Sequence, residues 1–155
     1  MWTRGRTMSH VQEAGYAGDV TPQDSLDALT RDAAAQLVDV RTTAEWAYIG
    51  APDLKAVGRE PIRIEWQVFP AMGINPDFVT TLAAKLAERG APKDAPLYFL
   101  CRSGIRSKAA AIAMTAAGHS RCYNVSGGFE GPHDEQGHRG TKAGWKAAGL
   151  PWVQP

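Results

Sequence analysis

The most informative segment of the sequence is "YFLCRSGIRSKAAAIAM", residues 98–114. It opens with an apolar run, passes through a cysteine, two arginines and a glycine, and ends in a small-residue pattern typical of a helix. This order predicts a buried strand that ends at Cys101, a tight turn, and a helix that starts beside the thiol. A strand followed at once by a helix is the repeating unit of an α/β fold.

Outward from this stretch, strands alternate with helices along the chain. Strands are expected just before Thr21, at 36–40 ("QLVDV"), at 61–66 ("PIRIEW", an edge strand), at 96–100 and at 121–125. Helices are expected from Thr21, from the capping box of Thr42 and Glu45, and at 75–90, 103–118 and 141–151. The pattern predicts an α/β protein with a parallel twisted sheet and helices on both of its faces.

Helical spacing also predicts which residues face the core. In the helix at 75–90, which Asn75 would cap and Pro76 would open, the inward set is Phe78, Val79, Leu82, Leu86 and Ala87. In the helix at 103–118 the inward set is Ile105, Ala109, Ile112 and Ala113.

Composition indicates an ordinary globular domain. The chain has 155 residues, an apolar fraction of 44% and a net charge of +1, so neither nucleic acid nor an anionic membrane is an expected partner. The N-terminus has no apolar segment of the kind that a secretory signal needs, and the expected location is the cytoplasm. Residues 1–14 are polar and irregular and are expected to be flexible, with one domain over 15–152.

The segment after Cys101 is suited to hold a negative charge. A strand-to-helix turn directs backbone N–H groups at one point, and the helix start adds about half a positive charge. Arg102 and Arg106 add cations, and Gly104 allows a turn that a Cβ would obstruct. These features favour a reactive thiolate at Cys101 over the alternative, a small buried apolar side chain.

The residues resemble those of rhodanese-domain sulfurtransferases. "CRSGIRS" at 101–107 is similar to that family's active loop, and "LVDVR" at 37–41, followed by Glu45 and Trp46, is similar to its first signature. The glycines at 127–128 and "GLP" at 149–151 resemble its closing pattern. The resemblance implies a rhodanese-like fold with a five-stranded, mainly parallel sheet. It also implies Cys101 as a nucleophile that becomes a persulfide, and a substrate-binding loop of Arg102, Ser103, Gly104, Ile105, Arg106 and Ser107. Asp39 and Arg41 match residues that help to order the active loop in that family.

The expected function is therefore sulfur transfer through a Cys101 persulfide. The donor would be a small anion such as thiosulfate, or a persulfide, and the acceptor would be cyanide or a thiol, including a protein thiol. No metal and no organic cofactor is expected. One alternative is a non-catalytic binding module on the same fold. A phosphatase or arsenate reductase is less favoured, because the spacing C-x-x-x-x-R is one residue shorter than theirs and Leu100 stands where tyrosine phosphatases usually carry His.

Several residues outside the loop have two interpretations. Cys122 is expected to be buried and unbridged, with a resolving-thiol role as the weaker alternative. Arg41 either supports the loop with Asp39 or pairs with Glu45 at a helix start. Trp66 and Phe69 either line the pocket or pack in the core.

The segment 129–144 looks like a polar, glycine-rich insertion relative to the family. It is expected on the active-site side of the sheet, as a lid or as a docking site for a partner. Its residues His133, Asp134, Glu135 and His138 suit solvated loop positions better than a metal site, because their spacing matches no known ligand pattern.

Overall fold

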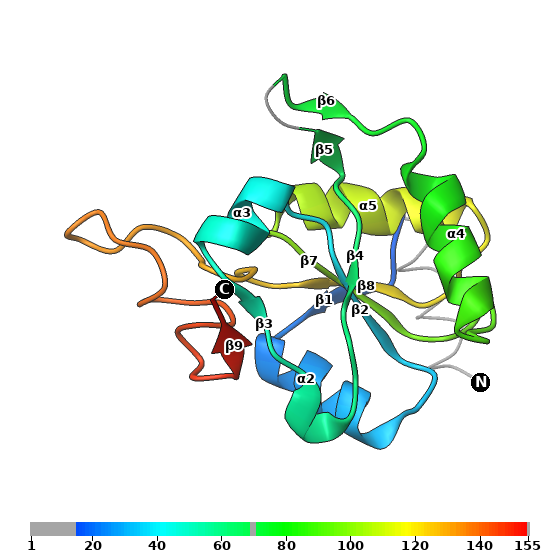
Figure 1. Cartoon of the computed structure of the whole chain (residues 1–155), viewed down its shortest axis with the longest axis horizontal. Helices are drawn as coiled ribbons and strands as arrows, with labels where there is room; N and C mark the ends of the chain where they lie inside the picture. Colours follow the sequence, from blue (N-terminus) through cyan, green and yellow to red (C-terminus); the bar gives the residue numbers. More distant parts are fainter. Residues whose placement is uncertain (1–14, 69–70, 155) are drawn as a thin grey trace.

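A five-stranded parallel sheet forms the centre of the protein (Figure 1). The computed structural model describes residues 15–68 and 71–154, so the flexibility expected for 1–14 lies outside the described residues. The strands run in the spatial order β1 (Gly18–Val20), β8 (Cys122–Val125), β7 (Leu97–Leu100), β2 (Gln36–Asp39) and β4 (Ile62–Arg63). The α/β class and the parallel sheet that the sequence predicts are confirmed.

Helices cover both faces of this sheet. Helix α2 (Pro22–Arg31) packs on one face, and helices α4 (Phe78–Glu88) and α5 (Ile105–Ala116) pack on the other. Alternate strand residues face the two sides: Val38 and Phe99 belong to the core under α4 and α5, whereas Leu37 and Leu100 belong to the core on the α2 side.

The predicted helix starts are confirmed where a side chain caps the backbone. The Thr21 hydroxyl accepts a hydrogen bond from the Asp24 N–H at 3.0 Å at the start of α2. Thr42 and Glu45 form the predicted capping box of α3 (Thr43–Tyr48). The short helix α3 thereby starts directly after the strand that carries Asp39, and places Glu45 near the cysteine loop.

Two of the predicted helical faces are partly wrong. Helix α4 begins at Phe78, and Asn75 does not cap it. The Asn75 side chain instead accepts a hydrogen bond from the Asp77 N–H and donates one to the Glu65 carbonyl. Ala87, which was predicted to face the core, is exposed. In α5 the buried residues are Ser107, Ala110, Ala111 and Met114, while Ile105 and Ile112 are exposed. Small alanines allow α5 to approach the sheet closely, and the polar Ser107 turns inward because it finds partners there.

The predicted closing helix at 141–151 is also wrong, because this segment forms consecutive turns. Gly144 has φ +101, a left-handed conformation that interrupts a helix, and an added Cβ would lie within 2.9 Å of the Gly127 carbonyl oxygen. After these turns, β9 (Trp152–Val153) pairs antiparallel with β3 (Ala51–Pro52).

The remaining elements are short. A single turn of 3-10 helix, η1 (Lys55–Val57), follows β3. A small antiparallel hairpin of β5 (Gln67–Val68) and β6 (Gly73–Ile74) stands out from the body beyond α3 and α5 (Figure 1). Within the described part of the chain, no helix has the length and apolar character to span a bilayer.

Candidate active site

Cys101 lies at the carboxyl end of β7, directly before α5, and its residue is 1% exposed. Among the described residues, two hydrogen-bond donors reach its sulfur: the Gly104 N–H at 3.1 Å and the Ser107 hydroxyl at 3.1 Å. Gly104 has φ +116, so a glycine at this position lets the backbone N–H turn back to the sulfur. The arrangement stabilises negative charge on sulfur at the start of a helix of twelve residues.

Ser107 connects the sulfur to a chain of polar side chains from neighbouring strands. Its single hydroxyl proton is shared between the Cys101 sulfur and the Asn124 side-chain oxygen, which accepts at 2.6 Å, and the Asn124 amide nitrogen donates to Asp19 at 3.1 Å. Asp19 also accepts from the Tyr16 hydroxyl at 2.9 Å. Burial, together with this hydrogen bond and the charge of Asp19, raises the pKa of Tyr16 to about 12. The sequence analysis missed Asn124 and Asp19, although polar residues within short buried strands are a signal for such a network.

Arg106 is held by Glu45 from α3. Two guanidinium nitrogens of Arg106 donate to the two carboxylate oxygens at 2.7 and 3.1 Å. Burial acts to raise the pKa of Glu45, but the hydrogen bonds and the charge of Arg106 outweigh it and hold this pKa below its ordinary value. Of the two interpretations of Arg41, the pairing with Glu45 is therefore wrong, because Glu45 forms a bidentate ion pair with Arg106.

Arg41 instead pairs with Asp39 at 2.7 Å, and both side chains are fully buried. The Arg41 guanidinium stacks over the Phe129 ring, 4.2 Å from its centroid. Phe129 in turn donates its backbone N–H to the Cys101 carbonyl at 2.7 Å. Arg41 thus reaches the cysteine loop through Phe129, and Asp39 reaches it through Arg41. Phe129 supports the site but was not predicted from the sequence.

The segment after β8 supports the loop through its backbone. The N–H groups of Glu130 and Gly131 donate to the Arg102 carbonyl at 3.0 and 3.1 Å. Gly128 has φ +62 and passes so close to the carbonyls of Cys101 and Arg102 that a Cβ would lie 2.6 Å from the Arg102 carbonyl carbon. The double glycine therefore permits two backbone segments to touch directly.

A pocket of about 280 Å³ lies over Cys101. Its lining residues come from α3, from the β5–β6 hairpin and from the cysteine loop, and are Glu45, Gln67, Met72, Cys101, Arg102, Ser103, Ile105 and Arg106. The pocket gathers five of the predicted site residues and adds Glu45, Gln67 and Met72. The insertion at 129–144 supplies none of the lining, so the expected lid is wrong for this segment and the hairpin occupies that place.

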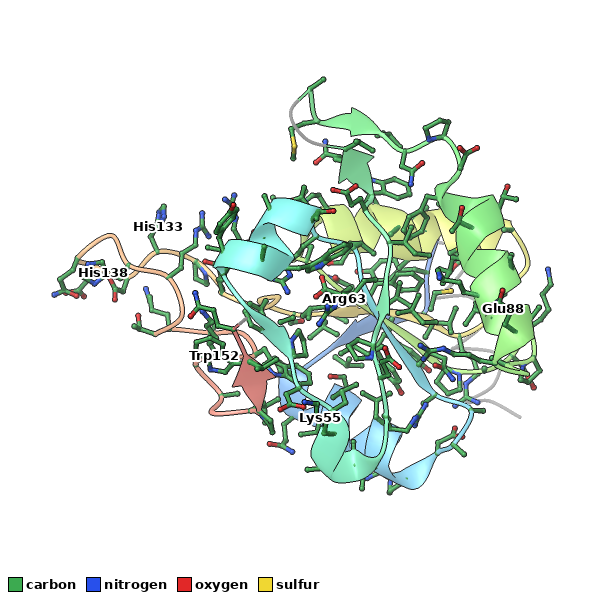
Figure 2. All side chains as sticks on the ribbon, in the orientation of Figure 1. Lys55, Arg63, Glu88, His133, His138 and Trp152 are labelled. Carbon is green, nitrogen blue, oxygen red and sulfur yellow. The ribbon has the colours of Figure 1, made fainter. Side chains whose placement is uncertain are left out.

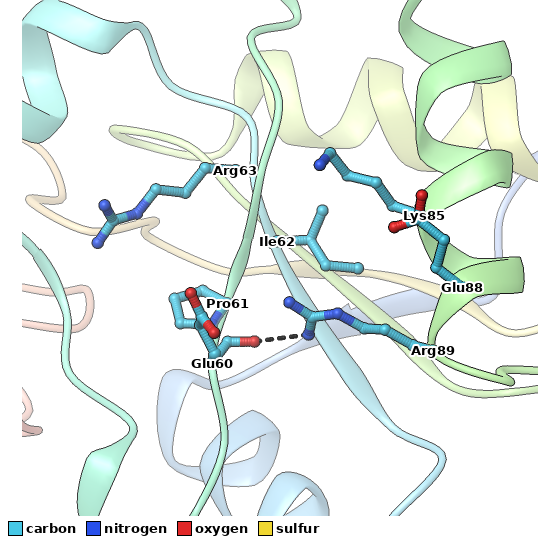
Figure 3. Close-up of a pocket in the computed structure, with 7 residues that line it drawn as sticks. All are labelled: Glu60, Pro61, Ile62, Arg63, Lys85, Glu88 and Arg89. Atoms are coloured by element: carbon cyan, nitrogen blue, oxygen red, sulfur yellow. Dashed lines mark hydrogen bonds between the residues drawn. The ribbon is translucent and has the colours of Figure 1, made fainter.

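A larger pocket, of about 320 Å³, lies elsewhere, between the edge strand β4 and α4 (Figure 3). The buried Ile62 is surrounded there by exposed charged side chains, namely Glu60, Arg63, Lys85, Glu88 and Arg89. Arg89 donates to the Glu60 carbonyl at 2.7 Å and has a structural role. Neither a thiol nor a predicted site residue lines this pocket, so the smaller pocket over Cys101 is the candidate active site.

The other candidate residues lie away from the pocket. Cys122 is buried and free, opposite Leu97 in the sheet register, and burial raises its pKa to about 11. Trp66 packs edge-on against Phe78 with ring centroids 5.0 Å apart, which is core packing, and Phe69 lies outside the described residues.

His133 and His138 lie on an outlying loop (Figure 2). Asp134 organises that loop by accepting from the Gln136 and His138 N–H groups, both at 2.9 Å, and from the Thr141 hydroxyl at 2.7 Å. Over the described ranges, no three His, Cys, Asp or Glu side chains are arranged to hold a metal ion.

The ion pair of Glu45 with Arg106 predicts a pH dependence of stability. Since the pKa of Glu45 is lowered in the folded protein, the stabilisation is complete above the ordinary value of 4.5 and is lost as the pH falls through the folded-state value. As the pH is lowered from above 4.5 to below the folded-state pKa of Glu45, we expect the free energy of unfolding to drop by about 1 kcal/mol more in the wild type than in Glu45→Gln. Urea unfolding from pH 7 to 3 measures this difference, and parallel curves would contradict it.

Three comparisons place this arrangement among known proteins. Residues 17–155 match the family described as "STR4 middle domain". An uncharacterized protein of Rickettsia conorii is 37% identical over 126 residues, which cover 81% of this chain and 89% of that protein. The crystal structure of Rv0390 from M. tuberculosis superposes with a TM-score of 0.78 at 46% identity, over 90% of this chain and 99% of that one. The chloroplastic rhodanese-like domain-containing protein 4 of Arabidopsis thaliana is 26% identical over 89% of this chain and 26% of its own length.

Proposed function

Because the chain belongs to the STR4 middle domain family and has a rhodanese-like fold, we propose that it is a sulfurtransferase whose nucleophile is Cys101. The sulfur would come from an anionic donor, thiosulfate or a persulfide, and would go to cyanide or to a thiol. The observation that carries the proposal is the Cys101 sulfur itself, which lies in a pocket and receives hydrogen bonds from the Gly104 N–H and the Ser107 hydroxyl at a helix start.

In the first half-reaction the Cys101 thiolate attacks the outer sulfur of thiosulfate. A new S–S bond forms, the old S–S bond breaks, and sulfite leaves with the electron pair. The negative charge passes to the terminal sulfur of the Cys101 persulfide. Arg102, an exposed cation in the pocket lining, attracts the anionic donor.

In the second half-reaction the acceptor attacks the terminal sulfur. The S–S bond breaks toward Cys101, which leaves as the thiolate, and cyanide becomes thiocyanate or a thiolate becomes a persulfide. The two groups that donate to the Cys101 sulfur, the Gly104 N–H and the Ser107 hydroxyl, stabilise the thiolate both when it attacks and when it leaves. The cycle balances without a metal or an organic cofactor; cofactor independence and a cytoplasmic location stay predictions.

Phosphate chemistry is supported less well by the same site. A cysteine phosphatase needs its loop arginine free to bind two phosphate oxygens. Here both terminal nitrogens of Arg106 donate to the Glu45 carboxylate, which neutralises the guanidinium charge that a phosphate would need. The engaged arginine and the short loop both favour sulfur as the transferred group.

Steady-state kinetics test the proposal. With thiosulfate and cyanide, the two half-reactions predict ping-pong kinetics, seen as parallel lines in double-reciprocal plots of thiocyanate formation. Lines that intersect would require both substrates to be bound together, and would overturn the covalent persulfide route.

Arg102→Ala is expected to weaken the use of small anionic donors. The KM for thiosulfate should rise by roughly tenfold with little change in kcat at saturation, because the lost cation attracts the donor without contacting the reacting bond. Arg121→Ala removes an exposed arginine just before β8, at the opposite end of the sheet, and serves as the matched control. Equal KM values for the two variants would contradict the role of Arg102.

A further inference from the structure

Three exposed apolar side chains lie at or beside the Cys101 pocket, although the proposed chemistry is ionic. Ile105 is 81% exposed, Ile74 is 62% exposed and Met72 is 36% exposed. Met72 and Ile105 line the pocket, and they come from different elements, the β5–β6 hairpin and the first residue of α5. Exposed apolar side chains that gather at a reactive site indicate a contact with another apolar surface.

Ile74 faces the same side as the pocket. It is paired with Gln67 across the hairpin, and directly opposed residues of an antiparallel pair lie on one face. Gln67 lines the pocket, so Ile74 extends the apolar rim from Met72 outward. Val68 is the next residue along β5 and therefore lies on the opposite face, although it is 43% exposed as well.

Met72 is fixed in place at the rim. It is the one non-glycine residue of the described ranges with a positive φ, +58, a conformation that costs an ordinary residue about 1 kcal/mol. The Met72 N–H donates to the Val68 carbonyl at 2.8 Å, and the Gln67 side chain donates to the Met72 carbonyl at 3.0 Å. These bonds hold Met72 beside the thiol pocket.

The charges of the pocket restrict what the rim can recognise. Glu45 neutralises Arg106, and Arg102 is the remaining cation of the lining. A thiosulfate ion can use Arg102 but gains nothing from Ile74, Met72 or Ile105, because its oxygens prefer water to apolar side chains. The pocket volume of about 280 Å³ admits one side chain, whereas the rim extends beyond it.

From this arrangement we infer that the sulfur acceptor is a cysteine in a peptide segment whose neighbouring side chains are apolar. The cysteine enters the pocket, and its neighbours pack against Met72, Ile74 and Ile105. The inference rests on the proposed sulfurtransferase function and names the class of acceptor for it. The acceptor thiolate takes the terminal sulfur of the Cys101 persulfide, and Cys101 leaves as the thiolate, so no other reactant is needed.

The test uses two capped peptides of equal charge, Leu-Cys-Leu and Ser-Cys-Ser. The full chain is first loaded with thiosulfate, freed of the excess, and checked by intact mass for the added sulfur. Each peptide is then added below saturation, and the loss of the persulfide is followed by mass. We expect Leu-Cys-Leu to discharge the wild type roughly tenfold faster than Ser-Cys-Ser.

Rim variants then locate the selectivity. Ile74→Ser and Ile105→Ser should each lower the ratio of the two rates to about threefold or less, since each removes part of the apolar contact. Val68→Ser on the other hairpin face and Ile112→Ser farther along α5 make the same exchange at exposed positions and should keep the full ratio.

Two results would overturn the inference. Equal rates for the two peptides on the wild type would show that the rim selects nothing, and an unchanged ratio in both rim variants would place the selectivity elsewhere. A failure of the proposed function is distinguishable, because then no persulfide forms in the loading step, before any peptide is added.

Discussion

Replacing Cys101 by serine is expected to abolish sulfur transfer while leaving the fold intact. A serine hydroxyl cannot form a persulfide, so the rate of thiocyanate formation should fall by at least roughly 10⁴-fold. Stability should change by less than about 1 kcal/mol, because the hydroxyl can keep the hydrogen bonds of Gly104 and Ser107. Thiocyanate assays and urea unfolding on the same samples measure both effects.

Cys122→Ser is the matched control, since it makes the same exchange at the other free and buried cysteine. Cys122 lies in the apolar core under α5, and its sulfur has a weak contact with the His119 carbonyl at 3.5 Å. The hydroxyl should therefore cost about 1–2 kcal/mol of stability and leave the activity of the folded protein unchanged. Activity that survives in Cys101→Ser, or disappears in Cys122→Ser, would contradict the assignment of the nucleophile.

Gly128→Ala is expected to have the second largest effect, on both stability and transfer. An added Cβ would lie 2.6 Å from the Arg102 carbonyl carbon and closer still to the Cys101 carbonyl oxygen. The positive φ alone costs about 1–2 kcal/mol, and the contact with backbone atoms should raise the total above about 3 kcal/mol. Because the loop that carries Cys101 must move, transfer by the folded fraction should fall by roughly 10²-fold.

Gly137→Ala separates the two causes of this loss. Gly137 has a similar φ of +79, but no heavy atom would lie within 4 Å of its added Cβ. It should therefore show the cost of the backbone conformation alone, about 1–2 kcal/mol, with unchanged transfer. Thermal unfolding and iodoacetamide labelling of Cys101 compare the two variants, and equal effects would mean that Gly128 does not hold the cysteine loop.

Local signals predicted much of the fold correctly. Thr21, Thr42 and Glu45 cap helices through contacts within four residues, and such contacts can be derived from the sequence alone. The apolar runs at β2 and β7 predicted buried strands, because both faces of a parallel sheet are covered. Cys101 falls at the strand end where the sequence placed it.

Predictions failed where long-range contacts decide the structure. The segment after 140 has a helical composition, yet Gly144 packs against the Gly127 and Gly128 carbonyls, and the turns that result lead into β9. The inward face of α5 was wrong because Ser107 finds the Cys101 sulfur and Asn124 on separate strands. The sequence did not predict that the β5–β6 hairpin lines the pocket. Its strands are too short to give a pattern, and its place beside Cys101 depends on the three-dimensional fold.

Intact mass after incubation with thiosulfate, and again after cyanide, tests the central claim most directly. We expect a gain of one sulfur atom, located on Cys101 by peptide mapping and absent in Cys101→Ser. We also expect that cyanide removes this sulfur and that an equal amount of thiocyanate appears. A folded sample that gains no sulfur, from thiosulfate or from a low-molecular-weight persulfide, would contradict the claim that this chain is a sulfurtransferase.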